Sequence, residues 1–560
     1  MSTKANAKRK GGLLSALIKI IISTAVIFAI FYVFLPPLNP MASEFWIFLT
    51  SALAIYLLPF GLGGMFKVYT LPGSASRVEL SHKTKTGGYK AMVGIVLVPV
   101  AVMVIGGVAS STFFNAKQYA GVIDVKEADF ATDMPETDNV TNIALMDTDS
   151  AVIIGNRALG SLSDVVSQYV LNGTYTQINY QGTPKKLSVL EYDGFFKWLG
   201  NRKEGVPGYV MVDPVANTAE FKKFGADKSI KYAESGYFSD DLMRKLRFEY
   251  PTKIFGGVAF EVDENGNPYY IVACMAPKVG LFGAYDVSEV IIFNPCAGNS
   301  AIVPVGQVPQ WVDIVYDGYL AEDKYNWHGL LSGGFWNSVI GNKGCKQTTD
   351  DFGYLMYDDD VWYYTGVTSV TGDASNIGFI VSNARTGEYK YYSIAGAEEY
   401  SAMNAAEGEV QEKGYTTSFP APINVAGEAT YIMVLKDASG IVKQYALVNV
   451  EHYSIVATGD TQAQAMSAYK KLLSQNGIVS GGIAETKSDI TISEIEKLVI
   501  DGNSWYYFLG SDGNYYCVSI ANDASALFIR KGDAITFTYT ETDTAGIRNA
   551  TEWAKSAPIA

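Results

Sequence analysis

Histidine is scarce in this chain, with three residues in 560. Zinc sites are built from several His and Cys ligands, so this shortage argues against a zinc centre. The patterns G-x-S-x-G, H-E-x-x-H and G-x-x-x-x-G-K-S/T are also absent, which removes the usual signs of a serine hydrolase, a zinc protease and a nucleotide-binding loop. We therefore expect no cofactor and a protein that is not an enzyme.

Cysteine is also rare, and the chain has four cysteines: Cys274, Cys296, Cys345 and Cys517. Four thiols in a chain of 560 residues do not make a disulfide scaffold. The sequence leaves open whether Cys274, Cys296 or Cys345 takes part in one bridge or whether all four are free.

Positive charge is concentrated at one end of the chain. Residues 1–112 contain ten Lys or Arg and two acids, which is a net charge of +8. Because the whole chain carries −14, residues 113–560 carry −22. A basic, apolar head on an acidic, aromatic body is typical of a membrane-anchored protein.

Three long apolar runs lie in this head, at about residues 13–35, 45–63 and 91–108. Each approaches the roughly 20 residues that a helix needs to cross a bilayer. The first run is longer than the apolar part of a signal peptide and ends in FLPPLNP rather than in small residues, so we interpret it as a retained anchor. The sequence predicts a membrane anchor over residues 1–112 with three transmembrane helices in contact with lipid.

The basic residues also predict an orientation. The N-terminal segment and the loop 67–90 are rich in Lys and Arg, whereas the loop 36–44 has none. Cytoplasmic loops collect Lys and Arg, so the N-terminus is expected in the cytoplasm. Three crossings of the cell membrane then place the large C-terminal domain on the extracytoplasmic side.

Residues 113–143 are polar, acidic and weakly periodic, and we interpret them as a tether to a folded body. That body, residues 144–477, repeats one pattern four times: a strand, a short turn that begins with Asp or Asn, and a second strand. The turns are 213–217, 294–298, 383–387 and 437–440. Asp or Asn at the start of a turn bonds its own backbone, and Gly near the end accepts a positive φ.

A helix-like segment follows each of these hairpins, and the four segments are 239–248, 308–315, 397–411 and 461–473. The spacing of the copies is irregular, so the pattern is a degenerate repeat rather than a solenoid. The sequence predicts an α+β body of hairpin-plus-helix units.

This unit resembles the PepSY fold, a small extracytoplasmic module of bacterial envelope proteins, some of them linked to peptidases. The stretch YYIVACMAPKVGLFGAYDVSEVIIFNPCAGNSAIVPVGQVPQWVDIVY resembles one such unit. The body over about residues 200–475 also resembles a little-characterised family of Gram-positive bacterial membrane proteins, and this resemblance is carried by IGFIVSNARTGEYKYYSIAGAEEYSAM and YIMVLKDASGIVKQYALVNV. The resemblance implies extracytoplasmic modules and gives no catalytic residues to carry over.

Five short strands are expected in residues 488–560, namely EIEKLVI, SWYYFLG, NYYCVSI, ALFIR and AITFTYT. Five strands of this size are similar to a small OB-like β-barrel. Such barrels often bind nucleic acid or sugar, but these strands are poor in Lys and Arg, and their aromatic side chains alone do not supply affinity for phosphate. We therefore expect no nucleic-acid partner.

Two groups of side chains are the candidate sites. Trp327, His328, Phe335 and Trp336 lie in a Gly-rich stretch that either lines a binding groove or fills a gap between modules. Asp358, Asp359 and Asp360 form an acidic run that is either a solvated surface or a weak calcium site, and the metal is unknown.

Two functions are compatible with these features. The first is an integral membrane protein whose extracytoplasmic, non-enzymatic domain binds or scaffolds other cell-envelope proteins, or regulates a peptidase. The second is an envelope hydrolase with a carboxylate-based site, which requires acids that converge in one cleft. The missing catalytic motifs favour the first, and the oligomeric state is left open.

Overall fold

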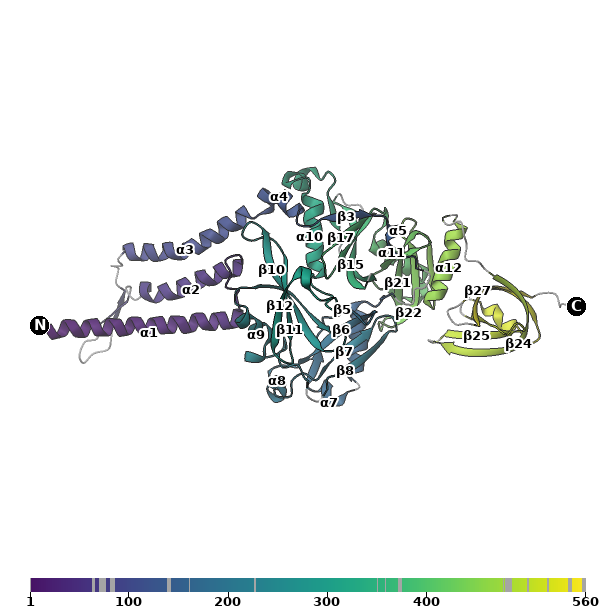
Figure 1. The fold of residues 1–560 in the computed structure, drawn as a ribbon, viewed down its shortest axis with the longest axis horizontal. Helices are drawn as coiled ribbons and strands as arrows, with labels where there is room; N and C mark the ends of the chain where they lie inside the picture. Colours follow the sequence, from purple (N-terminus) through teal and green to yellow (C-terminus); the bar gives the residue numbers. More distant parts are fainter. Residues whose placement is uncertain are drawn as a thin grey trace.

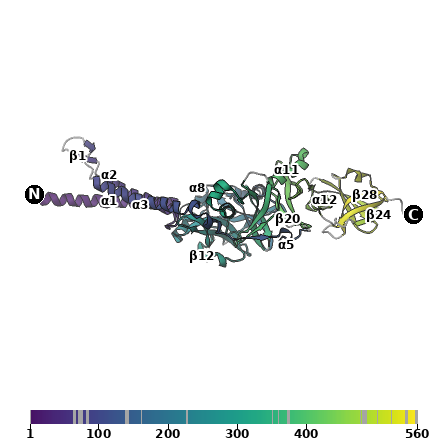
Figure 2. The same cartoon turned by 90° about the horizontal axis from the view of Figure 1, so that it is seen from above.

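The computed structural model describes residues 2–62, 66–69, 77–80, 86–137, 143–160, 162–225, 228–349, 351–357, 359–370, 375–476, 478, 486–500, 503–520, 523–541 and 546–555. The molecule is elongated (Figure 1). Long helices form one end, a mixed body of sheets and helices forms the middle, and a small β-domain forms the other end, as the second view confirms (Figure 2).

Three apolar helices form the N-terminal end: α1 (Ser2–Phe34), α2 (Ser43–Leu62) and α3 (Thr86–Ala109). Two of them contain segments long and apolar enough to cross a membrane, Ala16–Phe34 and Lys90–Ala109. In α2 the described apolar stretch, Ser43–Leu57, is shorter than a span. The structure therefore supports two of the three predicted spans, and a short hairpin, β1 (Phe66–Tyr69) with β2 (Arg77–Leu80), lies between α2 and α3.

The body consists of four largely antiparallel sheets, which we number by their order in the chain. Sheet 1 has the order β4-β6-β7-β8, with β5 beside β6, and sheet 2 has the order β12-β11-β10-β9. The strands of sheet 1 are β4 (Tyr169–Leu171), β5 (Thr176–Tyr180), β6 (Thr183–Tyr192), β7 (Gly208–Asp213) and β8 (Thr218–Lys223). The strands of sheet 2 are β9 (Ile254–Val262), β10 (Pro268–Val279), β11 (Gly283–Asn294) and β12 (Asn299–Pro304).

Sheets 3 and 4 are also antiparallel, except for the parallel pair β17–β3. Sheet 3 contains β3 (Val125–Ala128), β13 (Lys346–Thr348), β14 (Gly353–Tyr357), β15 (Asp360–Ser369), β16 (Ser375–Asn383), β17 (Tyr389–Tyr392) and β18 (Gly396–Ala397). Sheet 4 contains β19 (Thr416–Thr417), β20 (Ala421–Val425), β21 (Glu428–Lys436), β22 (Val442–Asn449) and β23 (Val456–Gly459). One hydrophobic core joins sheets 1 and 2, and a larger one joins sheets 3 and 4.

Helices cover and connect the sheets. They are α4 (Thr112–Ala120), α5 (Phe130–Asp133), α6 (Thr148–Gly160), α7 (Ser163–Val166), α8 (Phe195–Asn201), α9 (Leu242–Glu249), α10 (Gly318–Leu331), α11 (Glu399–Glu409) and α12 (Gln462–Gln475). The sequence predicted α9, α11 and α12 closely. The fourth expected helix, 308–315, is absent, because the backbone N–H groups of Asp313 and Ile314 donate to the carboxylate of Glu261 instead of to a helical carbonyl.

All four predicted hairpins are present: β7–β8, β11–β12, β16–β17 and β21–β22 are antiparallel pairs. In each turn the first side chain accepts two backbone N–H groups; at Asn383, for example, the donors are Arg385 and Thr386. Gly387 then takes a φ of +73° and donates its N–H to the Asn383 carbonyl. The turn residues therefore have the geometric role that the sequence indicated.

The segment that we interpreted as a tether is folded in its described part. β3 pairs in parallel with β17, α4 packs against α10, and the side chain of Phe130 is buried in the core of sheets 3 and 4. The sequence Val125–Ala128 carries little apolar periodicity, because an edge strand of four residues is held by backbone hydrogen bonds rather than by a buried face.

The C-terminal domain is a closed five-stranded barrel of order β24-β25-β26-β28-β27. Its strands are β24 (Thr486–Ile500), β25 (Asn503–Gly510), β26 (Tyr515–Ser519), β27 (Ala534–Glu541) and β28 (Ile547–Lys555). Strands β26 and β28 are parallel, and the other pairs are antiparallel. The expected strand ALFIR is wrong: residues 524–528 form a 3-10 turn capped by the Asp523 side chain, and β28 is the fifth strand.

The body is attached directly to the ends of the apolar helices. Arg244 and Arg247 of α9 donate to the carbonyls of Tyr32 and Leu35 at the end of α1. The Ser110 hydroxyl, just beyond α3, accepts the backbone N–H groups of Leu281 and Phe282. These bonds place the ends of α1 and α3 on the same side of the body, as Figure 1 shows.

Candidate functional site

A pocket of about 410 Å³ lies where sheets 1, 3 and 4 meet. Its walls come from β5 and β6, from β14, from α11 and β19, and from the connection before α6. A volume of this size is in the range of small-molecule sites, roughly 300–1,000 Å³. Four separate parts of the chain thus enclose one cavity.

Two polar side chains of sheet 1 form one wall of this pocket. Gln177 on β5 and Lys186 on β6 are directly opposite each other in the antiparallel ladder. Their exposed fractions are 2% and 3%. Cross-strand neighbours project from the same face of a sheet, so the two side chains act as a pair.

Neither side chain has a polar partner among the described residues. The amide nitrogen and oxygen of Gln177 make no hydrogen bond. Lys186 forms no hydrogen bond or ion pair with a described residue, and the charge that acts on it is that of Asp147. The Nζ of Lys186 lies 5.1 Å from the centre of the Tyr354 ring, which is a cation–π contact. Buried polar groups are normally hydrogen-bonded, so this pair is an exception. A bound ligand would supply the hydrogen-bond partners that the pair lacks.

Burial lowers the pKa of Lys186 to about 8, and the nearby carboxylate of Asp147 only partly opposes this. Asp147 is itself committed to Lys436, with which it forms an ion pair, and to the backbone N–H of Ser150. Although burial raises the pKa of Asp147, these hydrogen bonds hold it below its usual value. Asp147 therefore remains charged without neutralising Lys186.

The other walls are largely aromatic, and the mouth is acidic. Tyr354, Tyr364 and Phe419 line the pocket, and the Tyr364 hydroxyl donates to the carbonyl of Pro420. Asp149 and Asp351 lie at the exposed edge. The pocket thus combines a buried cation and amide, an apolar body and negative charge at its mouth.

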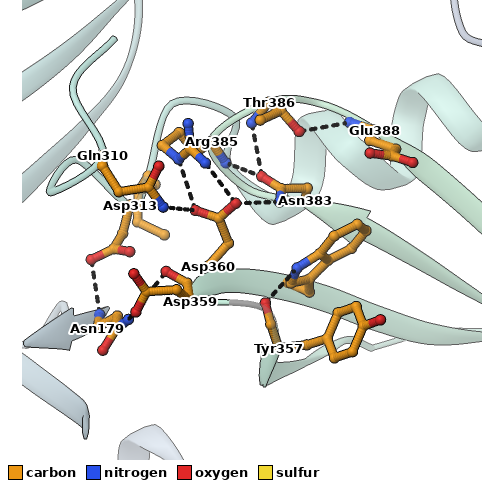
Figure 3. A network of polar contacts seen from close by, with 12 residues as sticks. Asn179, Gln310, Asp313, Tyr357, Asp359, Asp360, Asn383, Arg385, Thr386 and Glu388 are labelled. Atoms are coloured by element: carbon orange, nitrogen blue, oxygen red, sulfur yellow. Dashed lines mark hydrogen bonds and ion pairs between the residues drawn. The ribbon is translucent and has the colours of Figure 1, made fainter. Parts of the chain in front are cut away.

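The predicted acidic run has a different role, which Figure 3 shows. Asp360 is buried and receives two bonds of 2.7 Å from the Arg385 guanidinium and one of 2.8 Å from the Asn383 amide. Asp359 accepts a hydrogen bond from the Asn179 amide, while Asp358 lies outside the described residues. Across the described chain no group of three His, Cys, Asp or Glu side chains is arranged to hold a metal.

Beside this network lies a buried pair of acids that the sequence did not reveal. Glu261 accepts the N–H groups of Asp313 and Ile314, both at 2.8 Å, and Asp313 accepts the N–H of Asn179 at 2.8 Å. Burial raises the pKa of both carboxyl groups above their usual values, and each charge disfavours the other. These acids join sheets 1 and 2 to the connection between β12 and α10, and they do not line the pocket.

The four predicted aromatic-site residues do not form one groove. Trp327 packs edge-on against Tyr119 at 5.3 Å, and the His328 Nδ1 lies 3.0 Å from the Ala120 carbonyl oxygen. Phe335 is partly buried against Phe113. Trp336 alone is largely exposed, at 63%.

Trp336 belongs to an exposed apolar surface at the end of α3, which we call the helix-end patch. Its members are Phe113, Phe114, Trp336, Val339 and Ile340. Phe113 contacts both Phe114 and Trp336 through ring edges, at 4.7 and 5.8 Å. The patch begins within a few residues of the last residue of α3, Ala109.

All four cysteines lie in the described part of the chain, and all four are free thiols. The open question of a bridge among Cys274, Cys296 and Cys345 is thereby answered for this structure.

No protein-family model matches this chain, and no curated protein matches it either. The proposed function therefore rests on the geometry of the pocket.

Proposed function

We propose that this protein is a membrane-anchored binding protein of the cell envelope, with a non-enzymatic extracytoplasmic body that holds a small ligand. The observation that carries the proposal is the cross-strand pair Gln177 and Lys186 at the wall of a cavity of about 410 Å³. The Gln177 amide makes no hydrogen bond, and Asp147, whose charge acts on Lys186, is already paired with Lys436. An unpaired buried cation destabilises a fold, so its presence in a cavity is better explained by a ligand than by packing.

Membrane anchoring rests on α1 and α3, and we propose that α2 is the third span. The helix-end patch supports the same arrangement, because exposed aromatic and apolar side chains next to a spanning helix suit the membrane interface. The N-terminus would then be cytoplasmic, and the body would lie outside with its inner end resting on lipid.

We also propose that the body consists of PepSY-like units and that the C-terminal domain is an OB-like barrel. The first is supported by four hairpins with one turn geometry. The second is supported by the barrel order, in which the first strand pairs with the second and fourth and the third runs parallel to the fifth. Binding of other envelope proteins or regulation of a peptidase remains part of the proposal.

The alternative, an envelope hydrolase, needs acids that converge in an accessible cleft. The acid pair Glu261 and Asp313 is buried and bonded to backbone N–H groups, and Asp360 is bonded to Arg385. These positions favour structural roles. Asp149 and Asp351 lie at the mouth of the pocket, but both are exposed rather than held in a cleft, so binding is the better proposal.

The test is the melting temperature of the full-length protein in detergent. We expect Lys186→Met to raise the melting temperature, because the substitution removes the buried charge and keeps the apolar stem of the side chain. The free energy of unfolding should rise by up to about 3 kcal/mol at neutral pH. The matched control is Lys185→Met, the neighbouring lysine, which pairs with Asp213 at 2.5 Å. This variant should be neutral or destabilised by about 1 kcal/mol, and a fall in stability for Lys186→Met would contradict the proposal.

A further inference from the structure

The polar and apolar side chains of the pocket indicate which class of small molecule it binds. This inference rests on the proposed binding function. Two buried polar groups of the pocket wall have no hydrogen-bond partner among the described residues, a neutral amide on β5 and a lysine ammonium opposite it on β6. The ammonium supplies up to three donors, and the amide supplies two more. A ligand group that satisfies both must accept several hydrogen bonds and carry negative charge, as a carboxylate does.

Other charged side chains near the pocket are already occupied or lie at its edge. Lys436 and Asp147 neutralise each other within one ion pair. Asp149 and Asp351 are exposed at the mouth, where they favour a positive charge. Burial raises the pKa of Asp351, and a ligand cation beside it would favour its charged form.

The walls between these two ends suit an apolar body. Tyr354, Tyr364 and Phe419 present rings to the cavity, together with Met403 of α11. Tyr364 and Phe419 are stacked on each other at 5.9 Å, so their positions are mutually fixed. The sequence of environments from inside to outside is therefore cationic, apolar and anionic.

We propose that this pocket binds a small organic zwitterion, with its carboxylate on Lys186 and Gln177 and its cationic group beside Asp149 and Asp351. ω-Amino acids and short peptides with apolar side chains carry their carboxylate and ammonium at opposite ends, and they are the class with this charge arrangement. The carboxylate would give Lys186 the ion pair that it lacks within the described chain.

The experiment is calorimetric titration of the full-length protein in detergent with two matched sets of probes. One set is 6-aminohexanoate, hexanoate and pentylamine; the other is 8-aminooctanoate, octanoate and heptylamine. Within each set the skeleton is constant, and the charged groups are removed one at a time. We expect the amino acid to bind most tightly, the carboxylate more weakly and the amine most weakly.

Three variants assign the two ends. Lys186→Met should weaken binding of the amino acid and the carboxylate by about ten- to a hundredfold, as expected for a lost charge-assisted hydrogen bond. Asp351→Asn should weaken the amino acid alone, by about two- to fivefold, because an edge pair is screened by solvent. Lys185→Met, whose side chain pairs with Asp213 outside this pocket, should bind like the wild type.

Proton uptake gives an independent readout. A carboxylate beside Lys186 favours its charged form, so binding near pH 8 should take up protons in the wild type and not in Lys186→Met. The heat of binding would then depend on the ionisation enthalpy of the buffer only in the wild type.

The outcomes separate this inference from the proposed function. If Lys186→Met raises the melting temperature but no probe binds, the zwitterion assignment is overturned and the binding pocket stands. If the carboxylates bind as tightly as the amino acids and Asp351→Asn has no effect, the cationic end is overturned. If Lys186→Met is destabilised and no probe binds, both proposals fail.

Discussion

At the scale of single residues, the buried cations of this protein fall into two groups. Lys324 is 3% exposed and forms an ion pair of 2.7 Å with Asp286, and Arg385 is paired with Asp360. These cations are compensated, and removing one partner of such a pair typically costs about 3–5 kcal/mol. Lys186 is equally buried, but it contacts a ring face, and the nearby Asp147 is already paired with Lys436, so the charge of Lys186 destabilises the empty protein.

This difference predicts a pH dependence. Lys186 has a pKa of about 8 in the folded protein and 10.5 in the unfolded chain. Between these values the unfolded chain binds more protons, so the wild type gains stability as the pH rises, by up to about 3 kcal/mol.

Lys186→Met lacks this gain, so its stability advantage should be largest at neutral pH and should disappear as the pH rises through that window. Melting temperatures of both proteins across the window measure the effect. An advantage that does not change with pH would contradict an uncompensated buried lysine.

At the scale of elements, one pattern of turn residues, with Asp or Asn at the first position, produces four hairpins. Asp213, Asn294, Asn383 and Asp437 each accept two backbone N–H groups of their own turns. Asp263 does the same in the β9–β10 turn, where Gly266 has a φ of +74°. These bonds are made within a few residues, so the hairpins form from local sequence wherever the turn lies in the body.

Gly387 combines this local requirement with a tertiary one. Its φ is +73°, and a Cβ added there would lie 2.8 Å from the ring of Tyr316, which is buried. Gly427 has a φ of +86° but no heavy atom within 4 Å of the added Cβ.

We expect Gly427→Ala to cost about 1 kcal/mol for the backbone alone. Gly387→Ala should cost about 1–3 kcal/mol more, because the Tyr316 ring must move. Chemical or thermal unfolding compares the two variants, and equal losses would show that Tyr316 adjusts freely.

At the scale of the whole molecule, the body is fastened to the ends of the apolar helices and extends away from them (Figure 1). Arg247 is 4% exposed and donates to the carbonyls of Leu35 and Lys253, so the contact is buried and specific. The barrel lies at the opposite end, beyond α12 (Figures 1 and 2). The apolar helices and the barrel therefore lie at opposite ends of the molecule.

The proposed orientation predicts the labelling of single cysteines by a membrane-impermeant reagent in whole cells. In a variant whose four native cysteines are replaced by Ser, Glu220→Cys on the exposed side of β8 should be labelled. Ser2→Cys at the start of α1 should be labelled only after the cells are opened. The reverse pattern would overturn the assignment of sides.

The helix-end patch predicts a contact between Trp336 and lipid. In proteoliposomes, lipids brominated near the headgroup should quench part of the tryptophan fluorescence, and Trp336→Phe should reduce that quenched fraction. Trp505→Phe in the distal barrel, a buried position, is the control and should leave the fraction unchanged. Equal quenching in the wild type and in Trp336→Phe would place the patch away from lipid.

Much of the fold was accessible from the sequence because its determinants are local. The apolar helices, the four turns and the Thr461 cap of α12 depend on contiguous residues. The missing helix at 308–315 and the edge strand β3 were not accessible, because the first depends on Glu261 and the second on β17, both distant in the chain. The aromatic candidate site was divided for the same reason: Trp327 meets Tyr119, whereas Trp336 meets solvent.

The sequence alone therefore determined the apolar N-terminal helices, the hairpins and the acidic character of the body, since hydrophobic runs, turn residues and charge act over short distances. The pocket was decided by tertiary structure. Along β6, Lys186 and Ser188 alternate with Leu187 and Val189, which is the pattern of a strand with one solvated face. That polar face becomes buried because α6 and the segment before it pack against it and because Tyr354 of sheet 3 lies over Lys186. Only then does Lys186 become an unpaired cation in a cavity.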